Sequence, residues 1–253
     1  MESKTVMCRK GMSIVITFCI VIGVALCLSS CSATNELIDA INDNDIEKAE
    51  ALLNGGVDPN KTSIPPSDFW SFFEMSAKRP LSEACSTGDY EMVKLLIDYG
   101  ATAEFVDNTG WSPLRSSLFH YYTDSVEIVE LLLNNGADPY SDDAETYSHP
   151  VFSAASMLPK NFDVPYEERS IYDEESARGI TEIVKLLLKN ESIDMKSIDG
   201  KTVLICATKA GNVYLAEYAI SCGCDKTIMD NYGKTALDYA VDSGNEELIE
   251  LLR

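Results

Sequence analysis

Apolar residues recur along most of the chain in one pattern, in which an apolar residue stands three positions before a small one. Each copy predicts a short helix that packs on its neighbours through the small side chain. The six copies occupy residues 35–40, 79–84, 112–117, 149–154, 202–207 and 235–240. A second pattern follows most copies, with leucine-like residues and then glycine, as in Leu131, Leu132, Leu133 and Gly136. It predicts a second helix that ends near the glycine.

The copies form a repeat with a period of 33 residues. They start 44, 33, 37, 53 and 33 residues apart, so insertions of 11, 4 and 20 residues interrupt the period. Pro80, Pro113 and Pro150 stand at the first turn of the first helix, where a missing N–H costs no hydrogen bond. A single unit of this size cannot bury its own apolar face, so neighbouring units must stack on each other.

The unit resembles the ankyrin repeat, whose 33 residues form a turn and two helices with a Thr-Pro-Leu-His-x-Ala opening. Over residues 35–253 the resemblance implies an all-α ankyrin-repeat solenoid of about six helix-turn-helix repeats, starting near residues 35, 79, 112, 149, 202 and 235. It also implies a protein-binding function. No copy holds the histidine of that opening, which ties neighbouring turns together in the family, so we expect lower stability than in consensus repeats.

The two longer insertions lie near residues 61–78 and 157–179. The first is rich in aromatic residues, and Trp70 there is a candidate partner-binding anchor, unless these side chains fold back over the first repeat. The second is acidic and replaces the link between the two helices of the fourth repeat. It is either a solvated loop or a recognition loop for a basic surface. In the same repeat, Glu191 takes the place of the glycine that ends the second helix.

In ankyrin proteins the turn tips and the exposed face of the first helices form the concave binding surface. Carried over by position, the resemblance implies a partner-binding set in the third, fifth and sixth repeats. Its members are Asn108, Thr109, Trp111, Phe119, His120, Asp199, Lys201, Lys209, Asn231, Tyr232, Lys234 and Asp242.

The N-terminus has a different character from the repeats. Basic residues in Met1–Lys10 precede an uncharged apolar run, Met12–Leu28, as is typical of a signal peptide. Leu28-Ser29-Ser30-Cys31 follows and resembles the lipobox of bacterial lipoproteins. The resemblance implies cleavage before Cys31 and acylation of that cysteine, which would anchor the protein to a membrane by lipid rather than span it. An uncleaved signal anchor and ordinary cleavage are the alternatives.

These features divide the chain into a signal peptide (1–30), a lipidated cysteine with a short tether (31–34) and the repeat domain (35–253). The resemblance places the protein in a bacterial cell envelope, with the repeats in the periplasm or outside the cell. Ser32 follows the cysteine in place of Asp, which in the enterobacterial sorting rule favours the outer membrane.

Charge narrows the class of partner. The chain has 20 Lys and Arg against 41 Asp and Glu, a net charge of −21. Such a chain repels nucleic acid, which argues against DNA and RNA as partners. It attracts a basic protein at long range, although the same charge is explained equally well by keeping a monomer soluble.

Motifs for catalysis, metals or cofactors are not evident. His120 and His149 are the only histidines, and no nucleophile elbow, zinc-protease motif or phosphate-binding glycine loop occurs. We expect Cys85 and Cys206 to be buried thiols within helices, and a disulfide from Cys206 to Cys222 or Cys224 stays open. The pair Cys222 and Cys224 without further ligands is weak evidence for zinc. The sequence therefore predicts no enzyme, no cofactor and no metal site.

The favoured interpretation is a membrane-anchored protein-binding module of the bacterial envelope. In its sharper form, the module inhibits a toxin or regulates an envelope enzyme by capping it. An enzyme or metal site built on the insertions, and a passive structural component of the envelope, are the rival interpretations.

We predict that Trp111→Ala weakens partner binding and leaves the thermal midpoint of unfolding nearly unchanged. A tryptophan at an exposed position is unusual without a partner, and such residues carry a large share of binding energy. Binding assays and thermal unfolding of the same variant measure both effects, and a large drop in the midpoint would assign Trp111 to the core.

Overall fold

The computed structural model describes residues 32–63, 79–104, 112–119, 121–140, 149–159, 173–189 and 191–253. Every regular element within these ranges is a helix, so the expected all-α fold is confirmed. Several sequence-predicted features lie outside the described residues: the signal peptide, Cys31, Trp70, Asn108, Thr109, Trp111, His120 and most of both insertions.

The chain divides into two compact units, Met1–Pro80 and Leu81–Arg253. In the first unit, a helix over residues 32–42 precedes α2 (Ile46–Asn54), and Asp45 caps α2 by accepting a hydrogen bond from the Lys48 backbone N–H at 2.9 Å. Residues 32–34, which the sequence assigns to a tether, are therefore helical. Burial explains the difference, because Thr34 is 1% exposed and its neighbour along the helix face, Leu37, is fully buried.

The second unit consists of helix pairs in which a short first helix is followed by a second one. The pairs are α3 (Pro80–Thr87, beginning at the unit boundary) with α4 (Tyr90–Asp98), α5 (Pro113–Ser117) with α6 (Ser125–Asn134), α7 (Pro150–Ala155) with α8 (Glu174–Leu188), α9 (Val203–Ala210) with α10 (Val213–Ser221), and α11 (Ala236–Ser243) with α12 (Glu246–Leu252). Each first helix begins one residue after the position predicted from the repeat.

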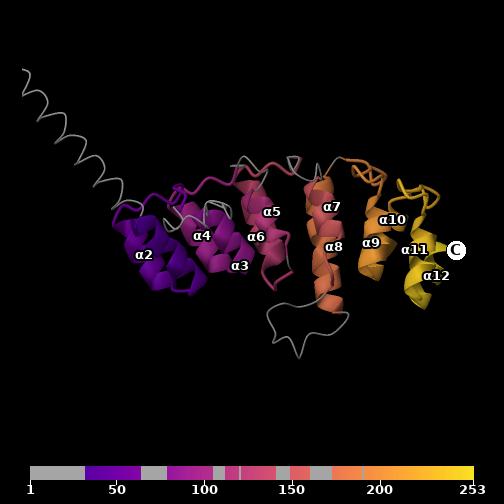
Figure 1. Cartoon of the computed structure of the whole chain (residues 1–253), viewed down its shortest axis with the longest axis horizontal. Coiled ribbons are helices and arrows are strands. Elements are labelled where there is room, and N and C mark those ends of the chain that lie inside the picture. The colour runs from indigo at the N-terminus through magenta and orange to yellow at the C-terminus, as the bar shows by residue number, and fades with distance from the viewer. Residues whose placement is uncertain are drawn as a thin grey trace, which may run out of the picture. The chain divides into compact units, whose positions relative to one another are not determined.

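Helices of the same kind pack side by side in the second unit. The first helices α5, α7, α9 and α11 contact each other in that order, and so do the second helices α4, α6, α8, α10 and α12 (Figure 1). The small residues Ala154, Ala207 and Ala240 of the first helices are fully buried, as are Leu132 and Leu215 of the second helices. The predicted division of roles, with small residues on first helices and leucines on second ones, is confirmed.

Local signals set the ends of these helices. Thr202 and Thr235 cap α9 and α11 by accepting hydrogen bonds from the backbone N–H three residues later. Pro113 and Pro150 occupy the first turn of α5 and α7, as predicted. Gly211 ends α9 at a φ of 75°, a left-handed conformation that glycine adopts without strain.

The fourth repeat departs from the expected boundaries. Its second helix, α8, was expected to follow Gly179 but begins at Glu174, so the last part of the predicted insertion is helical. Asp173 caps the helix by accepting a hydrogen bond from the Ser176 N–H at 2.8 Å, and the acidic Glu174 and Glu175 lie in the first turn, where the helix dipole favours negative charge. At the other end Lys189, not a glycine, has a positive φ of 39°.

Two further findings concern the length of the helices and the state of the cysteines. None of the described helices is long and apolar enough to cross a membrane. Cys85 and Cys206 are buried as expected, and Cys222 is exposed. All four cysteines in the described part of the chain carry free thiols, so the disulfide that the sequence left open does not form here.

We predict that Gly179→Ala destabilises the protein. In an open helix the change would add about 1 kcal/mol of stability. Here the new Cβ would overlap the Tyr121 hydroxyl oxygen and ring, and Tyr121 is only 5% exposed. Overpacking of this kind costs about 1–3 kcal/mol, so the net free energy of unfolding should fall by up to about 2 kcal/mol. Urea unfolding of the purified full chain measures it.

The control places the same alanine in a Tyr121→Ala background. Without the ring, Gly179→Ala should increase stability because only the helix-propensity gain remains. A rise in stability from Gly179→Ala in the presence of Tyr121 would contradict the close contact.

Candidate functional site

Two tight turns precede α9 and α11 and share one construction. In the turn Ser197–Lys201, the Ser197 N–H donates to the Lys201 carbonyl at 2.9 Å. In the turn Asp230–Lys234, the Asp230 N–H donates to the Lys234 carbonyl at 3.0 Å. Each turn has a glycine at a positive φ one residue before its lysine. The turns thereby place Lys201 and Lys234 directly before the helix caps Thr202 and Thr235.

Asn231 joins the two turns. Its backbone N–H donates to the Asp199 carbonyl at 2.9 Å, and its side-chain amide donates to the Ile198 carbonyl at 2.9 Å. A Cβ on Gly200 would lie 2.5 Å from the Asn231 amide oxygen, so this contact requires glycine at position 200. Asn231 thus ties neighbouring turns in a chain that lacks the histidine of the ankyrin opening.

A groove of about 510 Å³ lies between the Ser197–Lys201 turn and the first helices α5, α7 and α9. A second cavity of about 220 Å³ adjoins it and shares Ser156, Lys201 and Cys206. We call the two together the groove. Its walls are Arg115 from α5, Phe152, Ser153, Ser156 and Leu158 from α7 and the residues after it, Ser197, Ile198, Asp199 and Lys201 from the turn, and Cys206, Lys209 and Ala210 from α9.

Among the described residues, cations outnumber anions in the groove walls. Lys201 pairs with Asp199 at 2.7 Å, and this hydrogen bond raises the pKa of the Lys201 ammonium against the opposing effect of its burial. Arg115 is half-buried in the wall. Lys209 is exposed, with its ammonium 4.9 Å from the centre of the Tyr239 ring, and it forms no ion pair within the described residues.

Tyr239 and Asp230 orient the neighbouring lysines. The Tyr239 hydroxyl donates to the Asp230 carboxylate at 2.6 Å, which raises the pKa of Tyr239 to about 12 and keeps its proton in place. Lys209 and Lys234 both lie over the Tyr239 ring, and Lys234 also pairs with Asp242 at 2.6 Å. The Tyr239 ring therefore contacts both Lys209, at the groove, and Lys234, in the next repeat.

Cys206 is the only cysteine among the groove residues. It is 3% exposed, and burial raises the pKa of its thiol, although a hydrogen bond to Ser156 and the charges of Lys201 and Lys209 act the other way. A protonated thiol is a weak nucleophile, so the geometry does not support covalent catalysis at this position.

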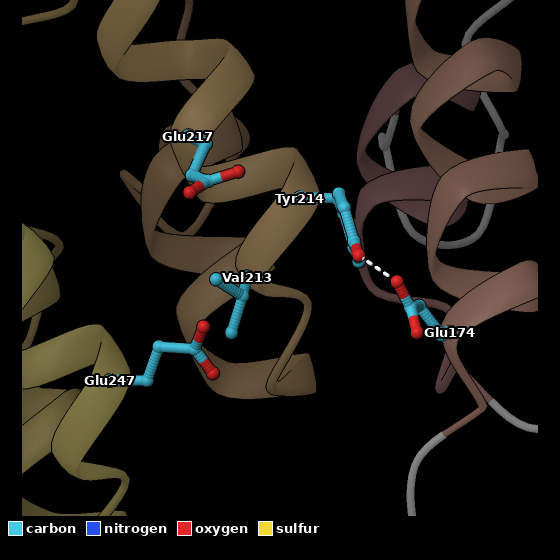
Figure 2. A pocket seen from close by; sticks show the side chains of 5 residues that line it. All are labelled: Glu174, Val213, Tyr214, Glu217 and Glu247. Carbon is cyan, nitrogen blue, oxygen red and sulfur yellow. Dashed lines mark hydrogen bonds between the residues drawn. The ribbon is translucent and has the colours of Figure 1, made fainter.

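A smaller, acidic cavity of about 270 Å³ lies where α8, α10 and α12 begin. Figure 2 shows Tyr214 pointing from α10 toward Glu174, with Glu217 and Glu247 on the opposite side. The Tyr214 hydroxyl donates to Glu174, and Arg178 donates to the same carboxylate at 2.6 Å. These contacts lower the pKa of Glu174, with the Tyr214 hydrogen bond the largest effect. No group of His, Cys, Asp or Glu within the described residues is arranged to hold a metal ion.

The structure brings together part of the predicted binding set. Asp199, Lys201 and Lys209 line the groove, and Asn231, Lys234 and Asp242 belong to the contacts beside it. Phe119 and Tyr232 are 63% and 75% exposed. Sequence reasoning missed the groove residues Arg115, Ser153 and Ser156. The sequence marks these three residues only by their position: Arg115 and Ser153 lie within the repeated pattern that forms the first helix, and Ser156 lies just after it.

The helix pairs, their linking turns and the groove on the first helices define a helical repeat protein. A family described as ankyrin repeats (3 copies) matches residues 37–143 and 175–253. The chain belongs to the ankyrin-repeat family, and the resemblance inferred from the sequence is confirmed. Ankyrin repeats are protein–protein interaction modules, and members of the family are typically binding proteins rather than enzymes.

Relatives come from viruses, bacteria, animals and fungi. A putative ankyrin repeat protein of fowlpox virus is 24% identical over 81% of this chain and 38% of its own length. A putative ankyrin repeat protein of Rickettsia bellii is 34% identical over 39% of this chain and 26% of its own length. One from Borreliella burgdorferi is 37% identical over 23% of this chain and 26% of its own length. The chain thus spans well under half the length of each.

We predict that Asp230→Ala destabilises the protein by about 1–3 kcal/mol at neutral pH, because it removes a buried carboxylate that accepts three hydrogen bonds. Asp230 is 5% exposed and accepts hydrogen bonds from the Tyr239 hydroxyl and from the Tyr232 and Lys234 N–H groups. Burial raises the pKa of Asp230, but these hydrogen bonds outweigh it and hold the pKa below its ordinary value of 3.8.

The pH dependence follows from the sign of this shift. A lowered folded-state pKa adds stability above the unfolded-state value, and that stability is lost as the pH falls through the folded-state pKa. The stability difference between wild type and Asp230→Ala should therefore shrink below about pH 4. Urea unfolding between pH 3 and pH 7 measures it, and a difference independent of pH would contradict this role.

Proposed function

We propose that the protein is a protein-binding module whose partner docks in the groove between the Ser197–Lys201 turn and helices α5, α7 and α9. The observation that carries the proposal is the groove itself, which is the largest of the three cavities described and combines polar, charged and apolar walls. Rigid helices and tied turns form these walls, so a partner would bind with little ordering of the protein.

Exposed apolar side chains stand at the rim of the proposed binding surface. Ile198, at the tip of one turn, lines the groove and is 59% exposed. Tyr232 stands at the tip of the next turn and is 75% exposed. Large apolar side chains at adjacent turn tips are suitable anchors for a partner, because their burial on binding is favourable.

The wider setting of the proposal comes from the sequence. Acylation of Cys31 after cleavage of residues 1–30 would hold the module at a bacterial envelope membrane, most favourably the outer one. The net charge of −21 would draw a partner of opposite net charge toward it. A regulator that caps a toxin or an envelope enzyme is the form of this function that both features support.

The rival enzyme or metal site is placed by the sequence on the two insertions, most of which lie outside the described residues. In the acidic cavity of Figure 2, which is described, the Glu174 carboxylate is engaged by Tyr214 and Arg178. A passive structural component would bind many proteins weakly, whereas the proposed module binds one partner through the groove.

We predict that a photo-crosslinking residue at Ser153 captures one partner in cells that express the full chain naturally. Ser153 is half-buried in the groove wall, so a bound partner would lie within reach. The control position is Glu217, which is exposed on α10 and lines the acidic cavity instead. Immunoblotting after irradiation measures the adduct. Either no adduct at Ser153 or the same adducts at both positions would contradict docking in the groove.

A further inference from the structure

The charge of the groove is opposite to that of the chain. Among the described residues its charged walls are Arg115, Lys201 and Lys209 against the carboxylate of Asp199, whereas the whole chain has about twice as many acidic as basic residues. A local excess of positive charge in an acidic protein is not explained by solubility, which the acidic residues already provide.

Lys209 is the cation most available to a ligand. Lys201 and Lys234 both have carboxylate partners, at 2.7 Å and 2.6 Å. Lys209 contacts the face of the Tyr239 ring, is exposed, and has no carboxylate partner within the described residues. The ring fixes the ammonium at the edge of the groove and leaves its N–H donors for a ligand.

Apolar groups adjoin these cations. Ile198 and Leu158 line the groove and are 59% and 50% exposed, and Phe152 forms part of its wall. A ligand that fits must therefore present an anionic group next to an apolar one. An extended nucleic acid fits poorly, because the rest of the chain would repel its many phosphates.

We propose that the groove binds an acidic segment of the partner protein, in which a Glu or Asp carboxylate pairs with Lys209 while a neighbouring apolar side chain packs on Ile198 and Leu158. This inference rests on the proposed protein-binding function and names the chemistry that the groove selects. The inference is compatible with a partner of basic net charge. The net charges of the two proteins act at long range, as the partner approaches, whereas the groove residues act only on the segment that they contact.

Selection of peptides from a random library displayed on phage tests the inference. The full chain in nonionic detergent is used as wild type, as Lys209→Glu and as the control Lys189→Glu. Lys189 is exposed at the end of α8 and is not among the groove residues, so the control repeats the charge change elsewhere on the surface.

We predict that the wild type and Lys189→Glu enrich peptides in which Asp or Glu neighbours an apolar residue, and that Lys209→Glu loses them. Fluorescence anisotropy of the best synthetic peptide should show binding to Lys209→Glu that is weaker by about tenfold or more, since a contacting charge pair becomes a repulsive one. Enriched peptides without an acidic excess, acidic peptides unaffected by Lys209→Glu, or no enrichment at all would overturn the inference.

Two further outcomes separate this inference from the proposed function. If Ser153 crosslinks a partner in cells and Lys209→Glu leaves that adduct unchanged, the groove binds a protein without using a carboxylate, and only this inference fails. If sedimentation shows a wild-type dimer that Lys209→Glu dissociates, the occupant is a second copy of this chain, which overturns the assignment to a different partner.

Discussion

Apolar packing between neighbouring helix pairs is the interaction on which the second unit depends. Ala154, Ala207 and Ala240 are fully buried on the first helices, where their small side chains let successive helices approach closely. No pair can bury these faces alone, so each repeat holds its neighbours in place. The groove is a consequence of this packing, because the spacing of α5, α7 and α9 sets the separation of its walls.

Polar contacts fix the orientation of neighbouring turns. Asn231 fixes one turn on the next, and Asp230 fixes Tyr239 against the turn that precedes its own helix. Such contacts contribute modest free energy each. They also determine where Lys209 and Lys234 lie, since both lysines use the face of the same Tyr239 ring. The local charge of the groove therefore depends on hydrogen bonds in the adjacent repeat.

The fold was predictable from the sequence because the repeat carries its signals locally. Proline and threonine mark where the first helices begin, and glycine marks where they end, as in Pro113, Thr202 and Gly211. The start of α8 was missed because its apolar periodicity begins near Ile180, while the capping group, Asp173, is one of many acidic residues in the insertion. The groove could be predicted only in part. The resemblance supplied Asp199, Lys201 and Lys209, but Arg115 and Ser153 come from other repeats, and a cavity depends on side-chain sizes summed across helices.

The groove lies where the residues of successive first helices differ, on a framework that the repeated packing holds in place. Ser153 and Cys206 occupy the same position of α7 and α9, and both are small, which leaves space in front of the turn. Tyr239 occupies that position in α11, where its ring fills the space and carries Lys209 instead. The small residues in two repeats therefore leave room for the groove, and the large Tyr239 in the next repeat holds Lys209 beside it. Because the apolar positions stay alike while the residues at this position differ, the chain can acquire a specific binding surface without changing the packing that holds its helices together.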